Sequence, residues 1–177
     1  MADGSYNGDM PVDPNFGFTF FDAPTHPIAE QLFNYWDGVR DTDQDVPQIE
    51  RFDPLGIAEI MPHITIVDIV DAEKFKYKVR LFGTSLVELA GEDRTGKMLD
   101  DFRFGDQNAA QLQTMFNRWR LLLSKCIKSR APNYTTGLHS DAERQYLRVH
   151  TAVLPLADAK GDITRCVGAM ASEPANK

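Results

Sequence analysis

The sequence contains few cysteines and has fewer basic than acidic residues. Its two cysteines, Cys126 and Cys166, form no CxxC pair and lie in apolar patterns, so we expect buried free thiols in a reducing compartment. The formal net charge is −7, from 19 basic and 26 acidic side chains. Nucleic acids and anionic membranes are bound through basic patches, so this balance argues against both as partners.

Targeting segments are also missing from the sequence. No apolar run approaches the ~20 residues that a transmembrane helix needs. The first residues do not show the basic stretch followed by an apolar one that a signal peptide requires. We therefore expect a cytoplasmic protein.

The spacings of common metal and catalytic sites are absent as well. The four histidines form no HExxH motif and no cysteine–histidine zinc pattern, so we predict no metal and no cofactor. A GxSxG nucleophile motif is lacking, and His150 is expected on the surface of a sheet rather than as a general base. We predict no catalytic residue.

Residues 91–97 read GEDRTGK, a near match to the GxxxxGK phosphate-binding loop. Met98 stands where that loop has the Ser or Thr that binds Mg²⁺, and the segment follows a helical pattern rather than a strand. We interpret it as a turn in which Gly91 and Gly96 adopt positive φ.

The most informative stretch is residues 75–97. Phe75, Tyr77, Val79 and Leu81 alternate with lysine and arginine, which predicts a half-buried strand. A short helix over Ser85–Ala90 follows directly and should fold back on the apolar face of the strand. The strand and the helix would then enclose either side chains alone or side chains and a small ligand.

The same periodicities predict the other elements of the chain. Helical segments are expected over Pro27–Arg40, Leu55–Met61 and 107–129, with Asp106 as the cap of the last. Strands are expected over Ile64–Val70, Asn133–His139, Gln145–Leu156 and Asp162–Ala171. We divide the chain into an irregular arm over 1–24, one domain over 25–172 and a tail over 173–177. Strands linked mostly by hairpins predict an α+β fold, a five-stranded antiparallel sheet with helices on one face.

This element order resembles a PAS domain, and local motifs narrow the resemblance to bacterial proteins that consist of little more than one PAS domain. The matching motifs are Tyr35-Trp36, Arg40, Phe52-Asp53-Pro54, Met61-Pro62, RLFGT at 80–84, GEDRTG at 91–96 and Leu154-Pro155-Leu156. The resemblance covers about residues 27–171 and leaves the aromatic-rich arm without a counterpart.

The resemblance implies a central cavity under the helices and a sensory or protein-interaction role without catalysis. Haem-binding PAS domains usually present a helical histidine to the iron, and the long helix here has none. Flavin-binding light sensors of this fold carry an Asn-Cys-Arg motif on a helix, which is missing. No set of ligand-binding residues is implied by the family.

We hypothesise a ligand pocket between the second strand and the helices. Its predicted lining is Tyr77, Val79, Leu81, Leu86, Leu89, Phe116 and Trp119. The alternative is a core that is fully packed by these side chains. Thr135 and Thr151 would add polar contacts if their strand faces point inward.

The first helix carries an apolar stripe of Leu32, Tyr35, Trp36 and Val39. This stripe packs either on the sheet of its own domain or on a partner subunit. In the second case it is a docking surface, and we predict a homodimer.

The sequence favours a sensor or adaptor that responds to a ligand or partner and signals through another protein, which stays unidentified. One alternative is a small cone-shaped α+β enzyme of the isomerase or dehydratase type. That fold usually places its long helices before most strands, whereas here two strands precede the long helix. A purely structural dimerisation module is the third alternative.

Overall fold

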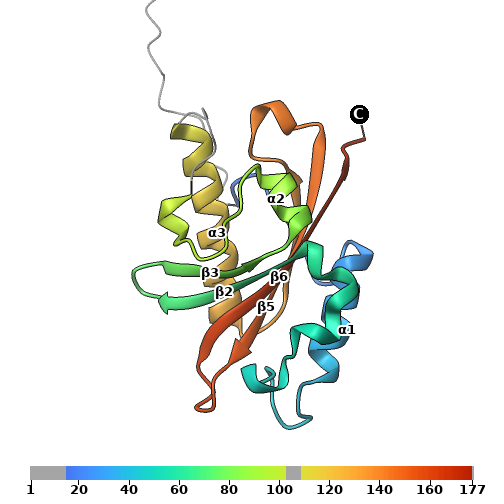
Figure 1. Cartoon of the computed structure of the whole chain (residues 1–177), viewed down its shortest axis with the longest axis vertical. Helices are drawn as coiled ribbons and strands as arrows, with labels where there is room; N and C mark the ends of the chain where they lie inside the picture. The colour runs from blue at the N-terminus through green and yellow to red at the C-terminus, as the bar shows by residue number, and fades with distance from the viewer. Residues whose placement is uncertain (1–14, 103–108, 177) are drawn as a thin grey trace, which may run out of the picture.

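Six strands form an antiparallel sheet in the computed structural model, which describes residues 15–102 and 109–176 of the chain. The strands are β1 (Thr19–Phe21), β2 (Ile64–Asp71), β3 (Lys76–Phe82), β4 (Asn133–Leu138), β5 (Leu147–Ala157) and β6 (Ile163–Pro174). They lie in the order β1-β4-β5-β6-β2-β3, so the long strands β5 and β6 run through the middle of the molecule (Figure 1).

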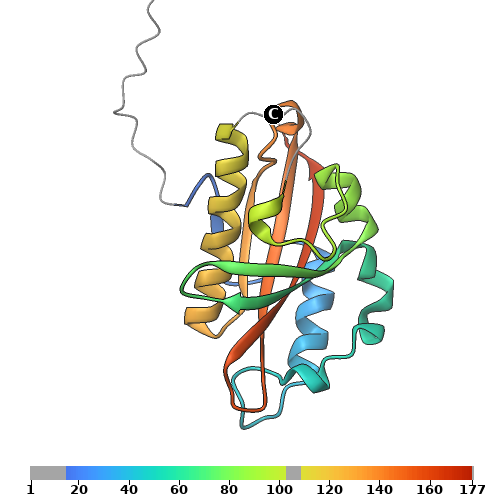
Figure 2. The same ribbon diagram turned by 60° about the vertical axis from the view of Figure 1, so that its left-hand side comes forward.

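Helices cover both faces of this sheet. The α-helices are α1 (Pro27–Gly38), α2 (Thr84–Ala90) and α3 (Ala109–Ser129), and short 3₁₀ segments are η1 (Ile49–Arg51), η2 (Pro54–His63), η3 (Leu99–Asp101) and η4 (Ala142–Arg144). Figures 1 and 2 show α1 and α3 on opposite sides of β5 and β6. The predicted α+β class is confirmed, but the prediction that helices lie on one face is wrong.

The central strands explain why both faces are covered. Ala152 and Leu154 of β5 belong to an apolar cluster with α1, while Val153 between them belongs to a second cluster with α2 and α3. In β6, Val167 likewise belongs to the cluster with α1, and Cys166 belongs to the cluster with α2 and α3. Successive side chains of a strand point to opposite faces, so an uninterrupted apolar run must be covered on both sides.

Helix α1 packs on its own sheet. His26 caps its first turn, with Nδ1 accepting a hydrogen bond of 3.2 Å from the amide of Ile28. Leu32 and Trp36 are 0% and 3% exposed, and the indole Nε1 of Trp36 donates to the carbonyl of Pro155 at 2.7 Å. The stripe that we considered as a docking surface is therefore used inside the domain, because Tyr35 and Val39 also pack against this cluster.

The β2–β3 hairpin contains a bulge that the sequence pattern did not reveal. Val67 pairs with Val79 and Ile66 pairs with Leu81, so Arg80 is an extra residue in β3. An extra residue reverses the alternation of the strand. Phe82 consequently joins Val79 in the α2/α3 cluster, and Leu81 packs with the α1 cluster instead.

The N-terminal arm contributes the sixth strand. β1 pairs with β4, with Thr19 opposite Thr136 and Phe21 opposite Tyr134. The segment over 1–24 is therefore not irregular throughout, and the sheet has six strands rather than the predicted five. At the other end, β6 extends to Pro174, two residues into the predicted tail. The predicted cap Asp106 lies outside the described residues.

The GxxxxGK segment is a turn, as predicted. Gly91 and Gly96 have φ values of 77° and 81°, and Gly91 ends α2 in the left-handed conformation. The backbone of this loop pairs with β3, with the amide of Val79 donating to Lys97 and the amide of Gly96 donating to Val79. Lys97 Nζ forms an ion pair of 2.7 Å with Glu92.

Candidate functional site

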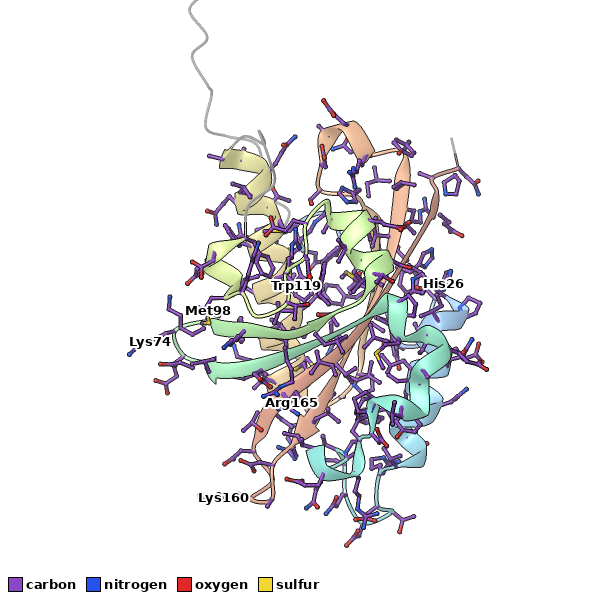
Figure 3. The ribbon with its side chains drawn as sticks, in the orientation of Figure 1. His26, Lys74, Met98, Trp119, Lys160 and Arg165 are labelled. Carbon is purple, nitrogen blue, oxygen red and sulfur yellow. The ribbon has the colours of Figure 1, made fainter. Side chains whose placement is uncertain are left out.

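A cavity of about 90 Å³ lies between α2, α3 and the sheet. Most of its lining is apolar, contributed by Phe18, Phe82, Leu86, Leu89, Ala90, Met115, Trp119, Leu122, Val149 and Met170. Its polar lining residues are Arg94, Arg118, His139, Ser140 and Thr151. Figure 3 shows Trp119 near the centre of the molecule, in the space between α3 and α2.

The volume limits what this cavity can hold. A single water needs about 10–15 Å³ of such volume, and an apolar cavity of about 150 Å³ accommodates benzene. Sites for drug-sized ligands are usually about 300 Å³ or larger. The cavity therefore has room for a few atoms, and a larger ligand requires part of the wall to move.

His139 and Arg144 hold the end of α2 over the cavity. His139 Nε2 lies 3.0 Å from the carbonyl oxygen of Leu89, and its Nδ1 accepts from the amide of Asp141 at 3.0 Å. These bonds require a neutral ring that carries its proton on Nε2. Burial lowers the pKa of His139, which favours the same neutral form. Arg144 Nη1 donates to the carbonyls of Glu88 and Leu89 at 3.0 and 2.7 Å.

Arg94 places a cationic group beside the cavity. Its side chain is 3% exposed, and its guanidinium carbon lies 4.5 Å from the ring centre of Phe102 and 5.6 Å from that of Phe82. Burial lowers the pKa of Arg94 to about 10, with an opposing contribution from Glu92. The group is therefore still charged at neutral pH, in contact with aromatic faces that favour a cation.

The predicted pocket residues divide into two groups. Leu86, Leu89 and Trp119 line the cavity. Thr151 also lines it and adds the polar contact expected for an inward-facing position. The other four predicted residues do not line it: Tyr77, Val79, Leu81 and Phe116. Tyr77 and Val79 are buried and Phe116 is partly buried in the same apolar cluster, whereas the β3 bulge turns Leu81 to the other face.

Several lining residues were missed by the sequence reasoning. Phe18 comes from the arm, and His139 and Ser140 come from the connection after β4. Arg94 lies in the loop after α2, where charged residues are expected in solvent. Only the four closely spaced phenylalanines at 16–21 gave a signal, which indicated that part of the arm docks either on the domain or on a second copy of the chain.

His150 lies away from the cavity and near the start of α1. Its Nδ1 is 2.9 Å from the hydroxyl of Thr25, its Nε2 is 3.0 Å from a carboxylate oxygen of Glu173, and its ring centre is 5.3 Å from that of His26. Within the described part of the chain, no group of three or more His, Cys, Asp or Glu side chains could hold a metal ion.

The two thiols meet in the core between α3 and β6. Cys126 and Cys166 are both free and buried, as predicted, with their sulfur atoms 3.8 Å apart. Burial raises the pKa of Cys126 well above its ordinary value, so the thiol form is strongly favoured.

None of the helices within residues 15–102 and 109–176 combines the length and the apolar character of a membrane span. A search of curated proteins finds no match to this sequence.

Solved structures with a similar arrangement include light-sensing and sensory proteins. The dark-state structure of the blue-light photoreceptor Aureochrome1 LOV is 10% identical, with a TM-score of 0.40 and coverage of 90% of each chain. An RNA-binding light-oxygen-voltage receptor is 11% identical, with a TM-score of 0.43 and coverage of 87% of this chain and 37% of that one. A sensory box histidine kinase/response regulator from Burkholderia thailandensis E264 is 11% identical, with a TM-score of 0.37 and coverage of 68% and 82%.

The sequence itself identifies the family. A family profile described as PAS domain matches residues 24–171, which is most of the chain. The matched region contains α1 through most of β6, including every element that surrounds the cavity except the segment with Phe18. The chain belongs to the PAS domain family.

Proposed function

We propose that this chain is a non-catalytic sensory module that binds a small ligand between α2, α3 and the sheet and signals through contacts with another protein. The observation that supports this proposal is the cavity itself, which lies among buried apolar side chains and carries a few polar groups. A mostly apolar cavity with few polar groups is the usual form of a small-molecule site.

The polar groups of the described lining favour binding over acid–base catalysis. They include two guanidinium groups, an imidazole and two hydroxyls, but no carboxylate among the described residues. Both ring nitrogens of His139 are occupied by backbone groups, so its proton is committed to the carbonyl of Leu89. An acid–base pair, which the cone-shaped enzyme alternative would need, is therefore not supported by this lining.

Native mass spectrometry of the freshly purified full chain tests the proposal. We expect an additional mass that disappears under denaturing conditions. The variant Leu89→Phe, which adds volume at the cavity wall, should lose this mass. The control Leu55→Phe should retain it, because Leu55 is 78% exposed and lies outside the lining.

If the purified protein carries no additional mass, we would screen small apolar compounds for their effect on its thermal denaturation temperature. Stabilisation of the Leu55→Phe protein, but not of the Leu89→Phe protein, would support the cavity as the site. Equal behaviour of both variants with every compound would contradict the proposed ligand site.

A homodimer is part of this proposal, and Tyr35 and Val39 are the residues of the α1 stripe that stay partly exposed for such a contact. Leu32 and Trp36 are buried in the folded chain, so removing residues 1–41 would expose the core rather than only an interface. Sedimentation of the full chain at several concentrations measures the oligomeric state without this complication. A single monomeric species at all concentrations would contradict the homodimer.

A further inference from the structure

We propose that residues 15–21 form a strap along one side of the cavity, and that a ligand too large for the cavity displaces Phe18 and releases β1 from β4. The inference rests on the proposed function, since the strap borders the same cavity. It adds a way in which a bound ligand changes the structure of the N-terminal segment, because β1 leaves the sheet when the ligand binds.

The strap lies outside the part of the chain that the family shares. The family match begins at residue 24, whereas β1 covers Thr19–Phe21. The five strands β2 to β6 lie within the match except for the last residues of β6, and β1 extends the sheet at the β4 edge. The strap therefore lies outside the matched family region, at the free edge of β4.

Phe18 connects the strap to the cavity. Its ring lines the cavity and packs against the cluster of α2 and α3. The ring also lies directly on β4 at Gly137, where a Cβ would be only 2.7 Å from Phe18 Cδ1. Phe18 thus occupies a space that exists because residue 137 has no side chain.

Arg118 of α3 joins the strap to the cavity wall. Its Nε donates to the carbonyl of Phe16 at 2.8 Å, and its Nη1 donates to the carbonyl of Leu138 at 2.7 Å. Its guanidinium carbon lies 4.7 Å from the ring centre of Phe18. One side chain therefore contacts the strap, the end of β4 and the cavity, so displacement of Phe18 changes all three contacts.

The strap is built to open more easily than the rest of the sheet. β1 has three residues and pairs with one neighbour, whereas β5 has eleven residues and pairs with two. Phe16 has a φ of 51°, in the left-handed region that a non-glycine residue adopts at an energetic cost. Although Phe18 and Phe20 pack against the α2/α3 cluster, a short element at the edge of a sheet opens locally at a lower cost than a central strand does.

The small volume of the cavity explains why a ligand would have to displace the strap. The cavity of about 90 Å³ is smaller than the 150 Å³ or so that holds benzene. A two-ring ligand can enter only if part of the wall moves, and Phe18, directly before β1, is the lining residue that the strap contributes. The affinity for such a ligand should therefore include the cost of opening the strap.

Indole is a suitable probe, because it is apolar and larger than benzene. Three variants are compared with the natural sequence. Phe18→Ala removes the ring, Gly137→Ala pushes the ring away without removing any lining atom, and Phe21→Ala is the control. Phe21 lies in the same strap but is 42% exposed and does not line the cavity.

Two quantities are measured on the full chain: indole affinity by NMR titration and amide hydrogen exchange of residues 18–21. With the natural sequence, we expect saturating indole to accelerate this exchange about tenfold or more, while exchange in α1 stays unchanged. Phe18→Ala and Gly137→Ala should exchange fast without indole and bind it about tenfold more tightly, because the opening cost is removed. Phe21→Ala should behave like the natural sequence.

Two results would overturn the strap while leaving the ligand cavity intact. One is indole binding with unchanged exchange at residues 18–21. The other is a Gly137→Ala protein that binds indole no more tightly than Phe21→Ala does. Failure of indole to bind any of the four proteins would overturn the cavity and the strap together. If Phe18→Ala does not fold, Arg118→Gln provides a second release, since it removes both bonds to the carbonyls of Phe16 and Leu138.

Discussion

The two faces of the sheet differ in how they are filled. On the α1 face, Leu32, Trp36 and Leu154 pack in one apolar cluster, and the indole nitrogen of Trp36 donates to a strand carbonyl. On the α2/α3 face, Trp119 borders a cavity, and Arg94 is buried beside it. The same strands β5 and β6 supply both faces. We infer that the α1 face mainly stabilises the fold, whereas the opposite face is less tightly packed and leaves space for a ligand.

The largest expected effect is a difference between the two tryptophans. Trp36→Ala should lower the free energy of unfolding by about 3–5 kcal/mol, the usual range for a buried tryptophan. Trp119→Ala should cost less, because an indole that borders a void has fewer contacts to lose. Urea denaturation of both variants measures the difference.

Trp36→Phe serves as the control for the hydrogen bond to Pro155. It keeps an aromatic ring in the α1 cluster and should lose much less than Trp36→Ala. An equal cost for Trp36→Ala and Trp119→Ala would contradict the difference in packing between the faces.

The second comparison enlarges a residue on each face. Ala152→Val adds volume to a fully buried position on the α1 face and should destabilise the protein by about 1–3 kcal/mol. Val149→Ile adds one methylene at the cavity wall and should change stability by less, with a gain of up to about 0.8 kcal/mol if the group fills the void. Thermal denaturation of the two variants tests this. Similar destabilisation by both would show that the α2/α3 face has no spare room.

A third prediction concerns pH and the cavity face. The pKa of His139 is lowered from 6.5 in the folded chain, mainly by burial, so the folded state favours the neutral ring. The stabilisation is therefore present above pH 6.5 and is lost as the pH falls through the lowered pKa. We expect the free energy of unfolding to decrease between pH 7 and pH 5. In His139→Gln the decrease should be smaller, whereas an identical pH dependence would contradict this role.

The smallest change in stability is expected for the surface ion pairs of Asp68, on the same face of the sheet as α1. There Asp68 of β2 accepts hydrogen bonds from Arg80 at 2.8 Å and Arg165 at 2.7 Å. The side chain of Arg80 is 54% exposed, so Arg80→Gln should cost less than about 1 kcal/mol. Asp68→Asn should cost more, because two arginines lose their carboxylate. Chemical denaturation compares the two, and a larger loss for Arg80→Gln would contradict this ranking.

Much of the fold could be predicted because its signals are local. The alternation around Tyr77, the periodicity of α1 and α3 and the turn glycines at 91 and 96 each reflect neighbours along the chain. The PAS resemblance, drawn from short motifs, agrees with the family match over residues 24–171. The bulge at Arg80 has no such local signal, and it alone moved Leu81 to the other face.

The candidate site was only partly predictable for a related reason. Leu86, Leu89 and Trp119 were found because they lie on apolar helix faces. Phe18 comes from the arm, which looked irregular, and it reaches the cavity through the pairing of β1 with β4. His139 was predicted as the last residue of a strand, and it reaches the cavity from the connection that follows β4. Their roles depend on contacts between residues far apart in the sequence.

The sequence by itself determined most of the strands and helices and the acidic character of this protein, because those properties follow from periodicity and composition. Only the tertiary structure decided that α1 is used within the domain, that a cavity survives on the opposite face and that Phe18 of the arm lines it. These outcomes depend on how side chains from distant segments fill a shared volume, and small differences in that filling are not encoded in any single stretch of the chain.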